Sequence, residues 1–169
     1  MEPLPHPNDL HLRAAQGWVE LGNHREADAE LEHLAAKWRS HPEVLEIRWQ
    51  IHALEKEWEK CADIAALFIR ALPEHHFGWV HRAYALHELK RTQAAYDNLA
   101  GVAGKFAGVW TIPYNLACYC SQLGRLEEAQ AWFNRALAID GKTAKEAGLN
   151  DPDLQPLWAF TGGPPSLPK

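Results

Sequence analysis

The sequence lacks the segments that would place a chain in a membrane or send it out of the cell. No run of 18 apolar residues occurs among its 169 residues, so no transmembrane helix is predicted. The first residues, MEPLPHPNDLHLR, contain two carboxylates and three prolines. A signal peptide would instead have a basic start and then an apolar run. We therefore expect a cytoplasmic protein that is not bound to a membrane.

Cysteine and positive charge are also scarce. The three cysteines are Cys61, Cys118 and Cys120, which include no Cys-x-x-Cys pair and cannot all pair with one another. Reduced thiols are the simplest interpretation. The 17 Lys and Arg residues are outnumbered by 22 Asp and Glu residues, the net charge is -5, and no basic block occurs. Because nucleic-acid backbones attract clustered positive charge, nucleic acid is not expected as a partner.

The sequence does have an ordinary globular composition, with 47% hydrophobic and 23% charged residues, and it repeats itself at a period of 34 residues. Steps of 34 residues connect positions of similar type, namely Ala15, Trp49, Ala83 and Ala117, and likewise Ala27, Cys61, Ala95 and Ala129. Within each period the apolar residues recur at helical spacing. Breakers at Gly22, Lys90 and Gly124 separate two helices per period. The sequence thus predicts four helix pairs, repeats 1 to 4, at residues 8–41, 42–75, 76–109 and 110–143.

Short segments flank the predicted repeats. Residues 1–7 form an N-terminal extension, residues 144–160 a cap of short helices and turns, and residues 161–169 a loose tail. A capping box from Thr143 to Glu146 predicts the first cap helix. Asp151 is expected to cap a further turn, with a break at Pro156. This arrangement would place Leu154, Leu157 and Trp158 on the last repeat.

The repeats resemble the tetratricopeptide repeat family. Repeat 4 matches its pattern at Asn115, Leu116, Ala117, Leu123, Gly124, Ala129, Phe133 and Ala136. Repeat 3 matches at Trp79, Ala83, Leu89, Ala95 and Leu99, whereas repeat 2 has Trp49 at a small-residue position. The resemblance covers residues 8–143 and implies an all-α, right-handed superhelical solenoid. It also implies a non-catalytic adaptor that binds a protein or peptide and needs no cofactor, and self-association is compatible with it.

In tetratricopeptide proteins the first helix of each pair lines a concave groove, which is the expected binding surface here. The outer sides of the first helices in repeats 3 and 4 carry aromatic, imidazole and uncharged polar side chains, which suit peptide capture. The residues expected to bind are Phe77, His81, Tyr84, His87, Tyr114, Asn115 and Gln122. The alternative is that the aromatic members only pack between neighbouring first helices.

A carboxylate clamp, which some tetratricopeptide proteins use to hold the C-termini of chaperones, is not expected. The clamp positions hold Leu12, Gln16, Ile47, Phe77 and His81 in one register, and Glu46, Gln50, His81, Thr111 and Asn115 in the next. None of these residues is the Lys or Arg that would grip a carboxylate. Asp9, Glu43 and Glu46 instead form an acidic groove entrance, which favours a partner with Lys or Arg at one end.

Metal and catalytic sites are not favoured by the histidines. His75 and His76 are adjacent with no third ligand, and His81 and His87 are six residues apart on one helix, too far to share an ion. No metal site is therefore expected.

Two rival functions remain open at this point. An enzyme would use Cys118 as a nucleophile with His81 or His87 as its base. A chaperone for a secreted bacterial client protein is the other rival. Separately, Trp132 is expected on the convex side, where it would mark a second contact or a dimer surface.

Overall fold

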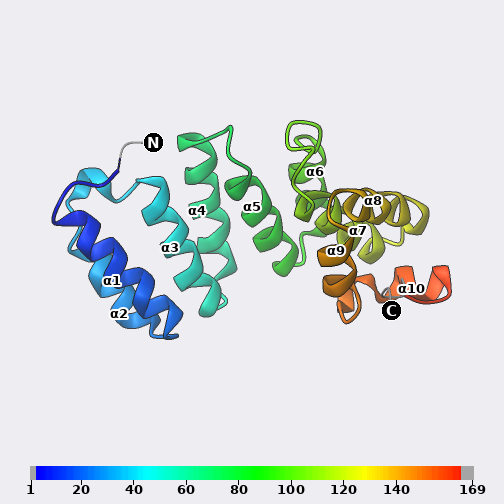
Figure 1. Cartoon of the computed structure of the whole chain (residues 1–169), viewed down its shortest axis with the longest axis horizontal. Helices are drawn as coiled ribbons and strands as arrows, with labels where there is room; N and C mark the ends of the chain where they lie inside the picture. The colour runs from blue at the N-terminus through cyan, green and yellow to red at the C-terminus, as the bar shows by residue number, and fades with distance from the viewer. Residues whose placement is uncertain (1–2, 165–169) are drawn as a thin grey trace. The chain divides into compact units, whose positions relative to one another are not determined.

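The computed structural model describes residues 3–164 as an all-α chain, and no strand occurs in that range (Figure 1). The all-α fold of paired helices expected from the sequence is confirmed. None of the helices in the described part of the chain is both long enough and apolar enough to cross a membrane. The chain divides into two compact units, a first unit of residues 1–82 and a second unit of residues 83–169.

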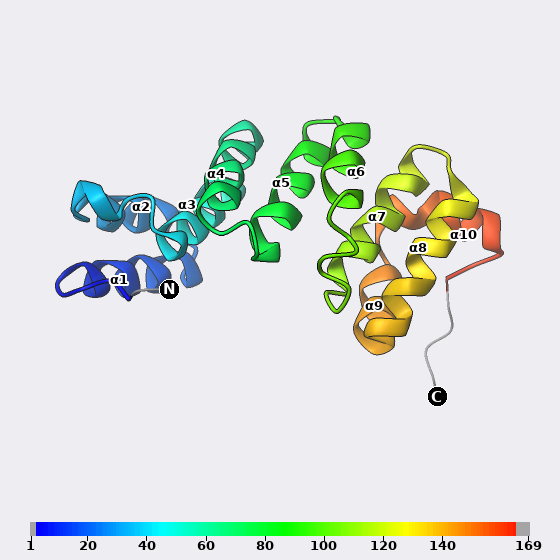
Figure 2. The same ribbon diagram turned by 90° about the horizontal axis from the view of Figure 1, so that it is seen from above.

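The first unit contains two helix pairs and the beginning of a third. Its elements are α1 (Asn8–Glu20), α2 (His24–Glu32), the 3-10 helix η1 (Ala36–Trp38), α3 (Pro42–Leu54), α4 (Trp58–Ala71) and the first part of α5 (His76–Glu88). α1 packs on α2, α3 packs on α4, and α3 also contacts α1 and α2 (Figure 2). Ala15 and Ala27 have no exposed surface, which allows α1 and α2 to approach closely. Leu4 of the N-terminal extension is also buried in this core.

The second unit is built around one central helix. Its elements are the rest of α5, α6 (Thr92–Ala100), α7 (Thr111–Gln122), α8 (Leu126–Ile139), α9 (Gly141–Gly148), the 3-10 helix η2 (Pro152–Leu154) and α10 (Gln155–Thr161). α7 contacts α6, α8, η2 and α10. Nine of its twelve residues are buried, from Ile112 to Ser121. A helix with one solvent-facing side would bury far fewer, so α7 is covered on nearly all sides.

A residue with positive φ ends the first helix of every pair. These residues are Gly22 (φ 72°), Lys56 (φ 57°), Lys90 (φ 62°) and Gly124 (φ 73°), each 34 positions after the last. In the fourth turn, Gly124 N donates to Ser121 O at 3.1 Å and Arg125 N to Cys120 O at 2.9 Å. The other three turns have the same pair of hydrogen bonds, which is the Schellman pattern. The sequence indicated three of these turns through their breakers but not the one at Lys56.

The C-terminal helices differ from the prediction at two positions. Asp140 caps α9, and its side chain accepts from Thr143 N at 3.1 Å, so the expected capping box at Thr143 is wrong. The reason is that α9 already begins at Gly141, directly after α8. Pro156 does not break a helix but lies in the first turn of α10, where its missing N–H would have no intrahelical partner.

Other expectations for this region are confirmed. Asp151 accepts a hydrogen bond from Asp153 N at 2.9 Å and so caps η2. Leu154, Leu157 and Trp158 are all buried. The Trp158 ring lies 5.0 Å from that of Phe133 on α8. Of the predicted loose tail, Thr161 belongs to α10, and residues 165–169 lie outside the described part of the chain.

Candidate functional site

Two of the predicted binding residues, Phe77 and His81, belong to an aromatic cluster in the first unit. Their rings stack at 3.8 Å between centroids. The indole of Trp49 meets His81 edge-on at 4.3 Å, and Phe68 lies 4.8 Å from Phe77. Cys61 also donates from Sγ to Trp49 O at 3.7 Å. Phe77 and His81 therefore accommodate the large Trp49 side chain at its small-residue position.

The surroundings of His81 also affect its titration. Burial lowers the pKa of His81 to about 4, against the opposing effect of its hydrogen bond to Phe77 O. His81 Nδ1 lies 3.0 Å from that carbonyl oxygen. Because the carbonyl can only accept, Nδ1 carries the proton. The imidazole is thus neutral at physiological pH and partly buried, which suits packing more than charge recognition.

The other predicted binding surface, on α7, is covered by the chain's own C-terminal segment. We call residues 151–157 the strap. Tyr114 Oη donates to Asp151 Oδ2 at 2.6 Å. His87 Nε2 lies 3.0 Å from Asp153 Oδ2, and because a carboxylate only accepts, this nitrogen donates. Two residues predicted to bind a partner thus hold the two carboxylates of the strap.

Two further contacts hold the main chain of the strap. Gln122 Nε2 donates to Asp153 O at 2.9 Å, and Leu157 N donates to Ser121 Oγ at 3.3 Å. His87 is fixed on its other side, with Nδ1 3.0 Å from Thr92 Oγ1. Main-chain contacts of this kind do not depend on the sequence of the bound segment, whereas the carboxylate contacts do. The surface therefore combines general and specific recognition of one peptide segment.

Cys118 lies under the strap and is not activated as a nucleophile. It is 4% exposed, and its Sγ donates to Asp151 Oδ2 at 3.6 Å. Burial, and then the carboxylates of Asp151 and Asp153, raise the pKa of the Cys118 thiol well above its ordinary value. A nucleophilic cysteine needs the opposite shift and access to solvent. The hypothesis of a Cys118-based enzyme has no support from this geometry.

Two more of the predicted binding residues are Tyr84 and Asn115, which are not fully buried. Tyr84 on α5 is 40% exposed, and Asn115 on α7 is half-buried. Tyr84 is thus a partly exposed aromatic side chain of the first-helix surface.

The three residues of the predicted acidic entrance lie in the first unit in different surroundings. Asp9 accepts a hydrogen bond from Arg13, one turn further along α1. Burial raises the pKa of Glu46, with His75 opposing the shift. Glu43 is half-buried on α3. Because Arg13 offsets Asp9 and burial disfavours charged Glu46, this surface is less negative than the sequence indicates.

One group of potential metal ligands occurs among residues 3–164, at the turn between α3 and α4. His52, Glu55 and Glu57 place ligand atoms within 4.8 Å of one another. The Lys60 ammonium donates to both Glu57 oxygens at 2.8 Å, and this contact lowers the pKa of Glu57. His52 Nδ1 is 2.7 Å from Glu57 Oε2. A lysine already neutralises the carboxylate, so the group is an ion-pair network.

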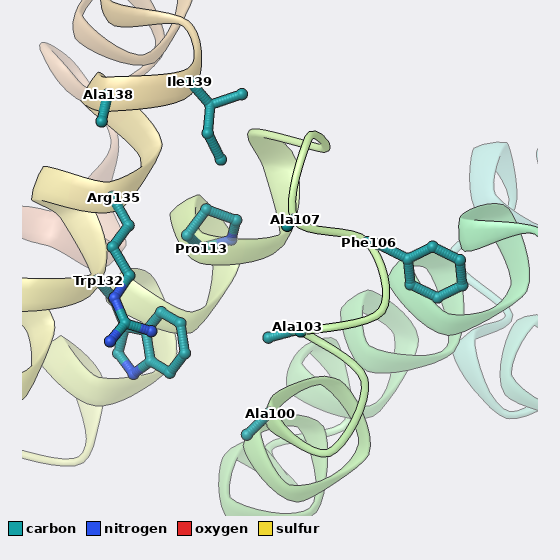
Figure 3. Close-up of a pocket in the computed structure, with 10 residues that line it drawn as sticks. Ala100, Ala103, Phe106, Ala107, Pro113, Trp132, Arg135, Ala138 and Ile139 are labelled. Atoms are coloured by element: carbon teal, nitrogen blue, oxygen red, sulfur yellow. The ribbon is translucent and has the colours of Figure 1, made fainter.

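Trp132 lines an open cleft in the second unit. The cleft has a volume of about 550 Å³ and lies between α8 and the loop that follows α6 (Figure 3). The Arg135 guanidinium lies over the Trp132 ring, 4.4 Å from its centroid. The sequence indicated Trp132 as a contact residue but gave no sign of the cleft beside it.

Comparisons with known proteins agree with this architecture. The family profile described as tetratricopeptide repeat matches residues 114–143, which is α7 and α8 with the turn between them. Residues 114–143 thus match one tetratricopeptide repeat. No curated protein matches this chain.

Solved structures share the fold of this chain over most of its length. MamA from Desulfovibrio magneticus RS-1 is 17% identical with a TM-score of 0.73, over 95% of this chain and 94% of that chain. YrrB, described as a TPR protein with an unusual peptide-binding site, is 13% identical with a TM-score of 0.67, over 90% of this chain and 76% of that chain. At these identities the likeness is one of fold.

Proposed function

We propose that this protein is a non-catalytic adaptor that binds a segment of another protein on the first-helix surfaces of its repeats. The fold it shares with YrrB, whose description includes peptide binding, supports this proposal. The rival enzyme hypothesis requires Cys118 as a nucleophile. The raised pKa of this thiol favours the non-catalytic proposal over that rival.

The observation that carries the proposal is the strap. Side chains of α5 and α7 hold it through two Asp carboxylates and through a main-chain carbonyl oxygen and amide, and main-chain groups are present in any bound peptide. Tyr114 and Gln122 were expected to bind a peptide, and here they bind one that belongs to the chain itself. The chemistry of this surface is therefore suited to holding a polypeptide segment.

The strap also limits where a partner binds. It covers α7, so the open first-helix positions are Tyr84 on α5, which is 40% exposed, and the outer side of α3, with Gln50 half-buried and Leu54 53% exposed. No Lys or Arg occupies the clamp positions, so we propose that a partner is held by an internal segment rather than by its C-terminal carboxylate. A preference for a basic residue in the partner would rest mainly on Glu43.

Site-specific photo-crosslinking in the full-length chain tests this proposal. Gln50 and Tyr84 are each replaced by p-benzoylphenylalanine, as is Leu21, which is 76% exposed in a turn and serves as the control for random collisions. After irradiation in the extract of the native cells, we expect an adduct of one defined mass from positions 50 and 84 and none from position 21.

Two crosslinking results would count against the proposal. Equal adduct yields from all three positions, or none from positions 50 and 84, would show that the first-helix surfaces of α3 and α5 are not used. A crosslinker at position 132, on the second helix of the last pair, separates this result from binding at another surface. An adduct from position 132 alone would place the partner on α8.

A further inference from the structure

The cleft beside Trp132 exists because α6 ends early. α6 has nine residues, whereas α4 and α8, the second helices of repeats 2 and 4, have fourteen each. The difference corresponds to roughly 7 Å of helix at about 1.5 Å per residue. The segment after α6, GVAGKFAGV, contains three glycines, and glycine is a poor helix former. A loop of successive turns thus replaces the end of α6 and leaves space in front of α8.

The walls of this cleft are almost entirely apolar and small. They include Ala100, Ala103, Ala107, Pro113, Ala138 and Ile139. Figure 3 shows Ala103 facing Trp132 across the opening, while the ring of Phe106 points away from it. The volume of about 550 Å³ lies within the range of roughly 300 to 1,000 Å³ that is common for binding sites. The small alanine side chains on these walls leave the space open.

The polar side of the cleft is formed by Trp132 and by Arg135, which is the charged residue among those that line the cleft. Trp132 Nε1 donates to Glu128 Oε1 at 3.4 Å, which orients the indole. The Arg135 guanidinium lies over the indole ring, 4.4 Å from its centroid. Within residues 3–164, the side chain of Arg135 has no carboxylate at ion-pair distance, whereas Arg125, which precedes the same helix, has Glu128 at 4.0 Å. A guanidinium held in this way offers a planar donor fork to an incoming carboxylate.

We propose that this cleft docks a segment of a partner protein in which bulky apolar side chains stand next to a carboxylate. The apolar side chains of the partner would pack against the alanine walls and Trp132. Its carboxylate would accept hydrogen bonds from Arg135. Arg135, Ala138 and Ile139 are exposed, Ile139 to 39%, so the cleft opens along α8 and suits a chain that continues beyond it. A small molecule in the same place would keep much of its surface in water, unlike most small ligands. The site lies on a second helix and does not depend on binding at the first-helix surfaces.

Matched peptides and the full-length chain test the proposal. The probes are fluorescein-labelled peptides that carry Leu-Leu or Phe-Leu followed, after zero or one glycine, by Asp, and the same peptides with Asn in place of Asp. Fluorescence anisotropy gives the Kd of each, and the indole N–H signal of Trp132 in NMR spectra reports the location. We expect saturable binding that shifts this signal, with the Asp peptide bound about three- to fivefold more tightly than its Asn counterpart.

Two arginine variants separate the cleft from general charge effects. Arg135→Gln is expected to bind the Asp and Asn peptides equally. Arg125→Gln removes the half-buried arginine that precedes α8 and lies over the ring of Tyr96 at 5.2 Å, and this variant is expected to keep the preference for Asp. Ala103→Leu fills the cleft and is expected to weaken both peptides at least about tenfold, because an overfilled pocket excludes them.

Several outcomes would overturn the proposal. These are the absence of saturable binding by every peptide in the set, equal binding of Asp and Asn peptides by the wild type, and a preference for Asp that survives Arg135→Gln. Binding of N-acetyl-leucine as tight as that of the best peptide would assign the cleft to a small molecule. A dimer in light scattering that Ala103→Leu abolishes would assign it to a second copy of the chain.

Discussion

Replacing the lysines that end α3 and α5 by glycine is expected to stabilise the protein. Lys56 and Lys90 have φ values of 57° and 62°, at the turn positions that Gly22 and Gly124 hold in the other two pairs. The left-handed conformation costs a residue with a Cβ about 1 to 2 kcal/mol. Glycine avoids this cost but loses roughly 0.5 to 1 kcal/mol more chain entropy on folding. The difference between the two costs is an increase of about 0.5 to 1 kcal/mol in the free energy of unfolding for each substituted turn.

The reverse substitution provides a check on the same reasoning. A Cβ added at Gly124 would meet no heavy atom within 4 Å, so Gly124→Ala has no steric cost. Its expected loss of about 1 kcal/mol therefore measures the backbone conformation alone. Lys56 and Lys90 are both exposed, so replacing them removes no buried contact.

Urea unfolding followed by circular dichroism measures these changes. Lys56 belongs to the first unit and Lys90 to the second, so each variant is compared with the transition of its own unit if the two separate. Lys145→Gly makes the same chemical change inside helix α9 and is expected to lose about 1 kcal/mol. The reasoning is refuted if Lys90→Gly lowers the free energy of unfolding as Lys145→Gly does.

Three further outcomes are expected from the same structure. Gly78→Ala should destabilise the first unit by about 1 to 3 kcal/mol, because its Cβ would lie 2.8 Å from Ile69 Cγ1. A Cβ at Gly17 would have no atom within 4 Å, so Gly17→Ala should instead stabilise α1 by up to about 1 kcal/mol. If urea unfolding showed Gly78→Ala to be more stable than Gly17→Ala, both expectations would be contradicted. The pKa of His81 is lowered by burial to about 4, so between that pH and about 6.5 the unfolded chain binds more protons than the native one. Unfolding free energy should thus fall by roughly 2 kcal/mol from pH 7 to pH 5, and a His81→Gln variant with the same slope would refute this cause. A maleimide should label Cys118 only on the timescale of local opening, and rapid labelling of one thiol in the native protein would revive the enzyme hypothesis.

The helix pairs could be predicted from the sequence because their signals are local and repeated. Small residues recur every 34 positions where two helices cross, and the same period locates all four turns. The turn at Lys56 was not indicated by a glycine, although its place 34 residues after Gly22 and 34 before Lys90 was available as a signal. The early end of α6 was also missed. Gly101 and Gly104 indicated it, but the period alone predicted a full second helix.

The site was less predictable because it depends on contacts between distant segments. Trp49 in a small-residue column indicated that its neighbours had to adapt, and Cys61 does contact it, but nothing local showed that Phe77 and His81 would pack on the indole. The strap lies outside the repeats, so the period says nothing about which helix it covers. The contact of Asp153 with His87 joins residues 66 positions apart, and a single sequence has no signal for such a pairing.

The strap and the cleft together decide which surfaces of the second unit a partner can use. The strap region buries Leu154, Leu157 and Trp158, and burying three such side chains contributes roughly 5 to 9 kcal/mol. The entropy lost on ordering the strap offsets part of this gain. A partner that required the strap-covered surface would have to displace these contacts, and its affinity would be lowered by that cost. Tyr84 at the edge of the strap and the cleft beside Trp132 carry no such cost, so binding to the second unit should begin at one of these two places.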